Sequence, residues 1–204
     1  MDSVQALFGS TPPSSLPHDW GIAPALDLIN SRWADHLGAG RSYDRLPDPR
    51  FRRAFLKRWR FKVADPDDRK ALLELARLRA FLRLVLERYI SGRELSAAMQ
   101  RDLEALVNLA PIRVHVDRGG GGALLHRPRS GRDWDTVMAE TATSAVRLMS
   151  ERRTVKVCAN PDCTWMFVDE SKPGTRRWCN PGVCGSLVNV RRYRSVHASK
   201  AGSR

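Results

Sequence analysis

The sequence predicts a mainly α protein: a helical N-terminal domain with a small β-hairpin, followed by a compact C-terminal module built around cysteines. Three observations support this prediction, namely apolar residues repeating every three or four positions, one alternating stretch beside four glycines, and four cysteines confined to 27 consecutive positions. A chain of 204 residues with 42% hydrophobic content can bury one core and carry a small appendix. We expect a loose arm over 1–21, the helical domain over 22–152 and the cysteine module over 153–204.

The helical domain is expected to begin with two short helices. In the stretch ALDLINSRWADHL, Pro24 suits the first turn of a helix. Leu26, Ile29 and Trp33 would then share one apolar face. A loop that contains glycine and proline follows, and a second short helix is expected near residues 50–60.

The longest helix is expected over residues 66–90. Asp65 can cap its first turn, and Pro66 fits the first helical position because that position needs no amide donor. Gly92 would end the helix, since glycine readily adopts the left-handed conformation that follows many helices. The apolar positions repeat at spacings of three and four: Leu72, Leu75, Leu78, Leu82, Val85 and Tyr89.

Two further helices flank a predicted hairpin. The first is expected over residues 96–109 and stops before Pro111. The alternating run IRVHV, four glycines and the run ALLHR then predict a β-hairpin with a flexible turn. A last long helix is expected over 133–151, and the cysteine segment begins directly after it without a long linker.

The formal charge of +13 and the isoelectric point near 10.6 favour polyanionic partners such as DNA, RNA or an anionic membrane surface. A merely solvated basic surface is the alternative. No stretch approaches the roughly 18 apolar residues that a membrane span needs, and the N-terminal residues lack the regions of a signal peptide. We therefore expect no membrane partner and a cytoplasmic protein, and 29 arginines against 6 lysines hint at a GC-rich bacterial genome.

The four cysteines, Cys158, Cys163, Cys179 and Cys184, form two pairs with four residues between the members of each pair. In the reducing cytoplasm, such a cluster indicates a metal site before disulfides. Zinc binds four thiolates in a tetrahedron at about 2.3 Å, so the sequence predicts one structural zinc ion held by these residues. Disulfides and unliganded buried thiols are the alternatives, but neither accounts for two equal spacings.

The residues around the cysteines also fit a metal site. Asn160-Pro161 and Asn180-Pro181 lie inside the two loops, where proline fixes the backbone and asparagine bonds locally. The 15 residues between the pairs suffice for a short hairpin. Lys156, Arg176 and Arg177 would offset the formal negative charge of four thiolates and one zinc ion. The expected aromatic cover of the metal is Trp165, Phe167 and Trp178.

The sequence shows no catalytic constellation, and we expect no enzyme. All four ligand positions are cysteine, whereas a catalytic zinc usually keeps one position open for water. The zinc deaminase pattern requires a histidine and a glutamate upstream of its cysteine pair, which this sequence does not show. Common hydrolase, metalloprotease and phosphate-loop motifs are absent from the sequence as well.

The segment after the last cysteine is strongly basic. From Ser171 onward, 34 residues contain eight lysines or arginines and no acidic residue, and so carry +8 of the total charge. A helix is expected to begin at Gly185 or Ser186, with Leu187 and Val190 packing on the zinc module. A solvated basic tail is the alternative to a binding surface. The arginines expected to contact nucleic acid are Arg176, Arg177, Arg191, Arg192 and Arg194.

The cysteine segment and the basic stretch VRRYR after it resemble the CGNR zinc-finger family. That family has Cys-x4-Cys, an aromatic stretch ending in Asp-x-Ser, then Arg-Arg-Trp-Cys-x4-Cys-Gly-Asn-Arg and a basic helix. Where the family has Asn-Arg, this chain has Ser186-Leu187, which removes an amide and an arginine from the start of the helix. The matching residues are Cys158, Cys163, Phe167, Asp169, Ser171, Arg176, Arg177, Trp178, Cys179, Cys184 and Gly185.

The N-terminal region resembles the stress-induced transcription-regulator domain that usually precedes this finger. The resemblance rests on LDLINSRW, on DRLPDPRFRRAFLKRW and on the long leucine-rich helix. Together the two resemblances cover most of residues 22–196. They imply a helical domain with a small β element, a treble-clef-like zinc module and a role in transcription.

The leading hypothesis is therefore a cytoplasmic, zinc-stabilised regulator that binds DNA, with RNA binding and a homodimer left open. A second hypothesis is an adaptor whose zinc module docks a protein partner. A third is an enzyme or ligand sensor with a pocket in the helical domain. Asp27 and Asn30, one helical turn apart, would line such a pocket, and the alternative for them is an anchoring hydrogen-bond pair.

Overall fold

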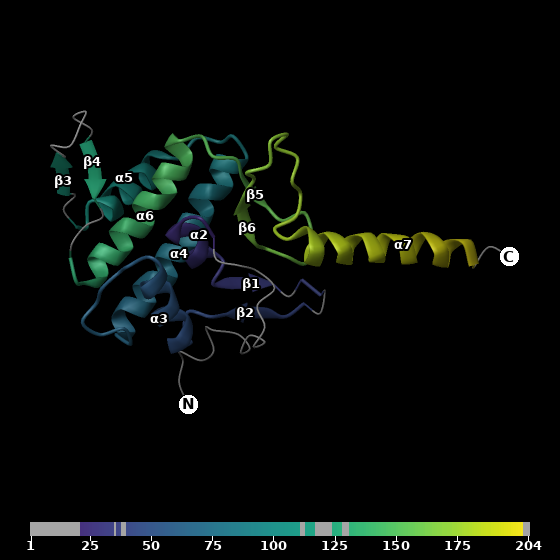
Figure 1. Ribbon diagram of the computed structural model, residues 1–204, viewed down its shortest axis with the longest axis horizontal. Helices are drawn as coiled ribbons and strands as arrows, with labels where there is room; N and C mark the ends of the chain where they lie inside the picture. The colour runs from purple at the N-terminus through teal and green to yellow at the C-terminus, as the bar shows by residue number, and fades with distance from the viewer. Residues whose placement is uncertain are drawn as a thin grey trace. The chain divides into compact units, whose positions relative to one another are not determined.

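The computed structural model describes residues 21–34, 36–37, 40–110, 113–116, 124–127 and 131–201 of the chain, and it is mainly α, as the sequence predicts (Figure 1). The described helices are α2 (Pro24–Ile29), α3 (Pro49–Arg58), α4 (Arg69–Ile90), α5 (Ala97–Val107), α6 (Trp134–Ser150) and α7 (Ser186–Ala201), with the π-helical turn η1 (Pro181–Gly185) before α7. The antiparallel strand pairs are β1 (Arg32–Ala34) with β2 (Ser42–Asp44), β3 (Arg113–Val116) with β4 (Leu124–Arg127), and β5 (Val155–Val157) with β6 (Met166–Val168).

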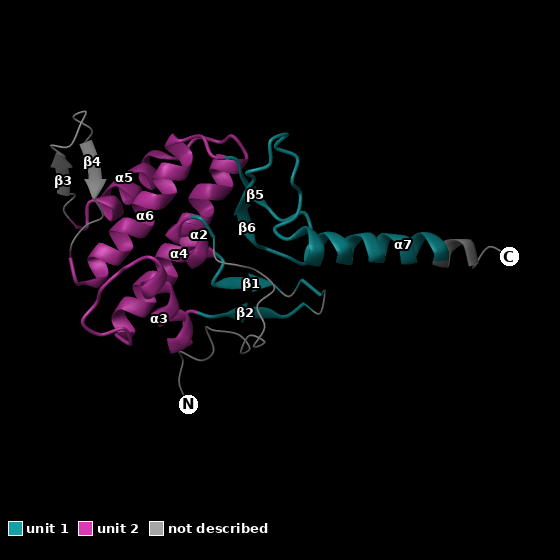
Figure 2. Ribbon diagram, in the orientation of Figure 1, with its two compact units in different colours: residues 1–22, 30–45, 154–204 teal, residues 23–29, 46–153 magenta. Residues whose placement is uncertain are grey.

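The chain divides into two compact units, which Figure 2 shows in different colours. Among the described residues, the helical unit contains residues 23–29 and 46–153, and the cysteine unit contains residues 21–22, 30–45 and 154–201. The stretch 22–152, expected from the sequence to form the helical domain, therefore contributes to both units. Its first hairpin, β1–β2, belongs with the cysteines.

Helix α6 forms the centre of the helical unit. Helices α2, α4 and α5 each pack against it, and its residues 136–143 are all buried. Small side chains at Ala139 and Ala142 are fully buried, which allows neighbouring helices to approach closely. The buried hydroxyls of Thr141 and Thr143 donate to the carbonyls of residues one turn earlier, so they leave no unsatisfied donor in the core.

Helix α4 starts three residues later than the sequence predicted, at Arg69 and not at Pro66. Asp68 caps the helix, because its side chain accepts hydrogen bonds from two amides of the first turn. The expectation that Asp65 and Pro66 begin the helix is wrong, since Asp65 instead accepts from the Asp67 amide in the preceding turn. Gly92 follows the last helical turn with φ +66°, as its predicted role as terminator requires.

The first helix is much shorter than the sequence predicted. Helix α2 ends at Ile29, and Trp33 lies in β1, where it faces Tyr43 of β2 in the antiparallel register. The amide of Arg45 donates to the carbonyl of Ser31 at 2.8 Å, which closes this hairpin. Pairing with β2 thus supersedes the local helical periodicity that placed Trp33 on a helix face.

The other predicted elements are confirmed. Helix α3 begins after its cap Asp48, α5 after Ser96 and α6 after Asp133, each cap side chain accepting a backbone amide. Strands β3 and β4 form the hairpin predicted around the glycine run, while the glycines themselves and residues 1–20 of the predicted arm (1–21) lie outside the described residues. Within the described part of the chain, no helix combines the length and apolarity needed to cross a membrane.

Candidate metal centre

The first cysteine pair lies in the connection between two paired strands. Strand β5 leads directly into Cys158, and β6 begins soon after Cys163. The amide of Cys158 donates to the carbonyl of Trp165 at 2.9 Å, which extends the ladder toward the sulfur. The sequence placed a hairpin between the two cysteine pairs, and this was wrong: β5 pairs with β6 across the first pair instead.

Both cysteine loops use an asparagine to fold the turn. The carbonyl of Asn160 accepts from the Cys163 amide at 2.9 Å, and the carbonyl of Asn180 accepts from the Cys184 amide at 2.9 Å. The side chains of the two asparagines accept further amides, from Asp162 at 3.2 Å in the first loop and from Val183 at 3.2 Å in the second. The predicted role of the Asn-Pro elements is therefore confirmed.

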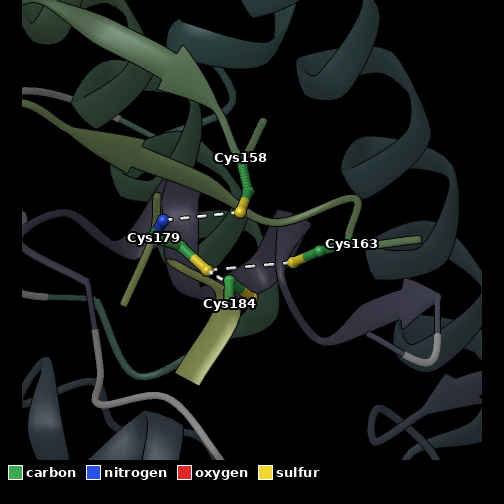
Figure 3. A group of neighbouring side chains, drawn as sticks. All are labelled: Cys158, Cys163, Cys179 and Cys184. Atoms are coloured by element: carbon green, nitrogen blue, oxygen red, sulfur yellow. Dashed lines mark hydrogen bonds between the residues drawn. The ribbon is translucent and has the colours of Figure 1, made fainter. Parts of the chain in front are cut away.

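The four sulfur atoms converge on one point (Figure 3). All four lie within 4.8 Å of one another, and every one of the four cysteines is buried. The Sγ atoms of Cys163 and Cys179 are 3.8 Å apart, and those of Cys179 and Cys184 are 3.6 Å apart. A tetrahedral ion with metal–sulfur bonds of about 2.3 Å holds its ligands about 3.8 Å apart. The observed spacing therefore fits one metal ion.

The four thiols influence one another's ionisation. Hydrogen bonds from Cys163 and then Cys179 lower the pKa of the Cys158 thiol to about 7. The pKa values of Cys163 and Cys179 are raised, first because each thiol donates a hydrogen bond to Cys158. One thiolate forms readily, but four together require a positive charge among them, which a divalent ion supplies.

Hydrogen bonds from backbone amides connect the two cysteine loops. The amide of Cys179 points at the sulfur of Cys158, with a nitrogen–sulfur distance of 3.5 Å (Figure 3). The amide of Ala159 donates to the carbonyl of Arg177 at 2.9 Å. These contacts fix the two loops relative to each other, and the Cys179 amide directs the positive end of its dipole at the Cys158 sulfur.

An aromatic shell surrounds the sulfurs. Trp165 and Phe167 are buried with the four cysteines, and Trp178 packs against them from a half-buried position, as the sequence predicted. Sequence reasoning missed Trp33 and Tyr43, which belong to the same buried cluster. Two aromatic residues on either side of a glycine-containing loop were the local signal that could have indicated this hairpin.

A buried carboxylate organises the loop before the second pair. The side chain of Asp169, fully buried, accepts from Lys156 Nζ at 2.6 Å, from the Ser171 hydroxyl at 2.6 Å and from the Arg176 amide at 2.9 Å. The Lys156 ammonium and the Ser171 hydroxyl hold the pKa of Asp169 far below its usual range. Lys156, expected to offset the thiolate charge, thus has a carboxylate as its partner.

The five arginines expected to bind nucleic acid divide into two groups. Arg176 donates to the carbonyls of Trp178 and Cys179, and Arg191 pairs with Asp162. These two side chains therefore support the metal-binding loops. The remaining three are exposed: Arg177, Arg192 and Arg194. The guanidinium of Arg177 lies 5.2 Å from the centre of the Trp178 ring.

Helix α7 begins at Ser186, as predicted, directly after the turn that holds Cys184. Leu187 is half-buried, but Val190 is 46% exposed, so the expectation that Val190 packs on the module is wrong. Tyr193 is 63% exposed and its ring stacks on the His197 ring, with 3.9 Å between their centres. The helix thus presents apolar as well as basic groups to solvent.

Asp27 and Asn30 are both buried and both hold structural partners. Asp27 accepts from the indole nitrogen of Trp59 at 2.9 Å and lies 3.5 Å from the guanidinium of Arg58. Asn30 exchanges two hydrogen bonds of 2.8 Å with the backbone of Met166. These hydrogen bonds anchor parts of the chain to one another. They correspond to the alternative that the sequence left open, an anchoring pair in place of a ligand site.

Comparison with known families agrees with the two resemblances. Residues 154–197 match the family model described as CGNR zinc finger. Residues 23–152, more than half of the chain, match the ABATE model, described as "Putative stress-induced transcription regulator". The first description names a zinc finger and the second a transcription regulator, and neither names an enzyme. A comparison with curated proteins found no match.

Proposed function

Since this chain belongs to the ABATE family and carries a CGNR zinc finger, we propose that it is a bacterial transcription regulator that binds DNA through α7. In this proposal Cys158, Cys163, Cys179 and Cys184 hold one zinc ion whose role is structural. The ion stabilises the turn from which α7 starts and so fixes the direction of the helix. The proposed site of action is the cytoplasm, where thiols stay reduced and available to zinc.

The observation that carries the proposal is the exposed face of α7. Arg192 and Arg194 are both exposed, and the helix contains no acidic residue. At 3.6 residues per turn, their side chains leave the helix about 160° apart. In this proposal they contact the two phosphate backbones on either side of a groove, and Arg177 in the preceding loop supplies a third exposed cation.

Between the two arginines, α7 presents residues suited to base edges. Asn189 and Tyr193 are exposed and lie one turn apart, on the arc between Arg192 and Arg194. The major groove admits an α-helix, and an asparagine amide can pair with both hydrogen-bonding atoms of adenine. We assign these two residues to sequence reading and the arginines to phosphate contact.

The departure from the family motif fits this division. Ser186 and Leu187 stand where the family has Asn-Arg, and Leu187 is half-buried. The first turn of α7 therefore contributes little polar recognition. The next two turns carry the exposed arginines and Asn189, so DNA contact is assigned there.

The test is fluorescence anisotropy with short random-sequence duplexes over a range of salt concentrations, alongside metal analysis of the same protein. We expect one zinc per chain and an affinity that falls steeply with salt, since each phosphate contact contributes about 0.9 to the slope of log K against log salt. No binding at low salt, or a slope near zero, refutes DNA binding. A nuclease-resistant pull-down partner would instead favour an adaptor.

Matched variants localise the contact. The double variant Arg192→Ala/Arg194→Ala should reduce the salt slope by roughly 2 relative to the unchanged chain. The control removes the same charge from exposed sites in the helical unit, Arg69→Ala/Arg101→Ala, and should leave the slope nearly unchanged. Equal losses in both double variants would mean that net charge alone, rather than α7, attracts the DNA.

A further inference from the structure

The hairpin β1–β2 lies more than a hundred positions before the cysteines, yet it shares their buried core. Trp33 and Tyr43 belong to the same cluster as the four cysteines, Trp165 and Phe167. We propose that this hairpin is part of the metal centre, with Asn30 and Trp33 as positioning residues that govern how tightly the metal is retained. The matched finger segment, residues 154–197, is on this view an incomplete site.

Asn30 completes the sheet beside the first cysteine pair. Its amide nitrogen donates to the Met166 carbonyl at 2.8 Å, and its amide oxygen accepts from the Met166 nitrogen at 2.8 Å. Strand β6 is paired with β5 along one edge, so the asparagine side chain acts as a one-residue strand on β6. Both Asn30 and Met166 are buried, and loss of the amide would leave two polar backbone groups without water or protein partners.

Further contacts from the same hairpin hold the loop between Cys158 and Cys163. The side chain of Asn160, fully buried, donates to the carbonyl of His36 at 3.1 Å. The amide of Ala34 donates to the hydroxyl of Thr164 at 3.0 Å, immediately after the second cysteine of this pair. The hairpin therefore forms hydrogen bonds with the metal-binding loop near its middle, at Asn160, and at its end, at Thr164.

Trp33 forms one wall of the sulfur site. Its side chain is 2% exposed, and its ring meets the Trp165 ring edge to face, with 6.1 Å between centres and 74° between planes. The guanidinium of Arg45 lies 5.1 Å from the Trp33 ring and 5.6 Å from the Trp165 ring. This wall would exclude water and competing ligands from the sulfurs, and it brings a buried positive charge to the aromatic shell of a thiolate site.

The inference rests on metal binding by the four cysteines, and its test separates the two. Zinc release to a chromogenic chelator is timed for the whole chain and for two variants, Asn30→Ala and Trp33→Phe. We expect release to accelerate about tenfold for Asn30→Ala, because unsatisfied buried polar groups weaken the strand that carries the loop. Alkylation of the cysteines should accelerate in parallel.

The control variant is Ser144→Ala in the helical unit. It removes the acceptor of a hydrogen bond from the Ala25 amide, 3.0 Å long, without touching the cysteine unit. Its zinc release should match that of the unchanged chain. Circular dichroism of each variant shows whether the helices remain folded. Trp33→Phe is the more conservative variant because it keeps an aromatic ring, and it provides the test if Asn30→Ala unfolds.

Two results would overturn the inference in distinguishable ways. Should the unchanged chain contain zinc while both hairpin variants release it no faster than Ser144→Ala, the hairpin plays no part in metal retention and the metal site itself stands. Should the unchanged chain contain no zinc, the metal centre fails and the inference falls with it.

Discussion

Arg191, on the basic helix α7, forms an ion pair with Asp162 in the loop of the first cysteine pair. The same guanidinium donates to the carbonyl of Leu37 in the connection between β1 and β2. One arginine of the basic run therefore ties the helix to the metal-binding loop and to the hairpin. Its neighbour Arg192 is exposed and belongs to the surface assigned to DNA.

The two neighbouring arginines should accordingly separate stability from binding. Arg191→Ala is expected to lower the unfolding free energy by about 1 kcal/mol, since it removes a half-exposed ion pair and a hydrogen bond. Arg192→Ala should leave stability unchanged and weaken DNA binding. Urea unfolding and anisotropy on both variants give the comparison, and identical profiles for the two would contradict this assignment.

Gly185 faces the indole of Trp178 so closely that a side chain has no room. A Cβ at this position would lie 2.9 Å from Trp178 Cδ1. Gly185→Ala should therefore displace the indole, cost about 1–3 kcal/mol and speed zinc release. Gly182→Ala is the matched control in the same turn, because its Cβ would meet only Asn180 Oδ1, at an ordinary 3.5 Å. Equal behaviour of the two alanine variants would mean that the contact with Trp178 is unimportant.

Asp169 should be needed for order in the loop that precedes Cys179. Asp169→Asn removes the charge that binds Lys156 and weakens the acceptor for Ser171 and Arg176. We expect a lower unfolding free energy and faster tryptic cleavage after Arg176 and Arg177, the sites in this loop that no proline follows.

The sign of the pH dependence for Asp169 follows from its lowered pKa. The carboxylate stabilises the fold fully above the ordinary aspartate pKa of about 3.9, and this contribution is lost as the pH falls below that value. The penalty of Asp169→Asn should thus be the same at pH 7 and pH 6. Asp102→Asn, at an exposed position on α5, is the control expected to change little.

Two helices, α3 and α6, are each followed two residues after their end by an arginine in the left-handed conformation. Arg60 has φ +56° and Arg152 has φ +51°, where a side chain is strained. Arg152→Gly is expected to raise the unfolding free energy by about 1 kcal/mol. Arg152→Ala keeps the strain while removing the charge and should not stabilise. The reverse change, Gly92→Ala at φ +66°, should destabilise by a similar amount, and thermal melts measure all three.

Removal of the metal should affect the two units differently. With zinc chelated, α7 loses the anchored turn at its start, and a 16-residue helix alone is marginal in water. We expect a partial loss of helical circular dichroism, protease sensitivity after Arg192 and Arg194, and a preserved melting transition of the helical unit. Complete unfolding on chelation would show that the helical unit depends on the metal.

The elements that the sequence predicted well are those with local signals. The long helix α4 has an uninterrupted apolar repeat, and the β3–β4 hairpin alternates on both sides of a glycine run. The cysteine quartet was equally readable, because equal spacing leaves few chemical interpretations. The structure brings those four sulfurs together as the spacing required.

The parts that sequence reasoning missed depend on distant partners. The stretch around Trp33 has helical spacing, and only the pairing of β1 with β2 and the bonds from Asn30 to Met166 reveal it as extended. Arg191 and Arg192 look alike in sequence, and only the position of Asp162 separates a structural arginine from an exposed one. Three-residue strands and single ion pairs leave too little pattern to be read locally.

The separation of Asn30 from Met166, 136 positions along the chain, has a consequence for biosynthesis. A ribosome adds roughly 5–20 residues per second, so the nascent β1–β2 hairpin waits on the order of ten seconds for its partner strand. During that interval Trp33 lacks the Trp165 ring, which packs against it in the finished protein. Metal binding by the four cysteines would then follow translation of the whole helical unit, which makes it a late step in maturation.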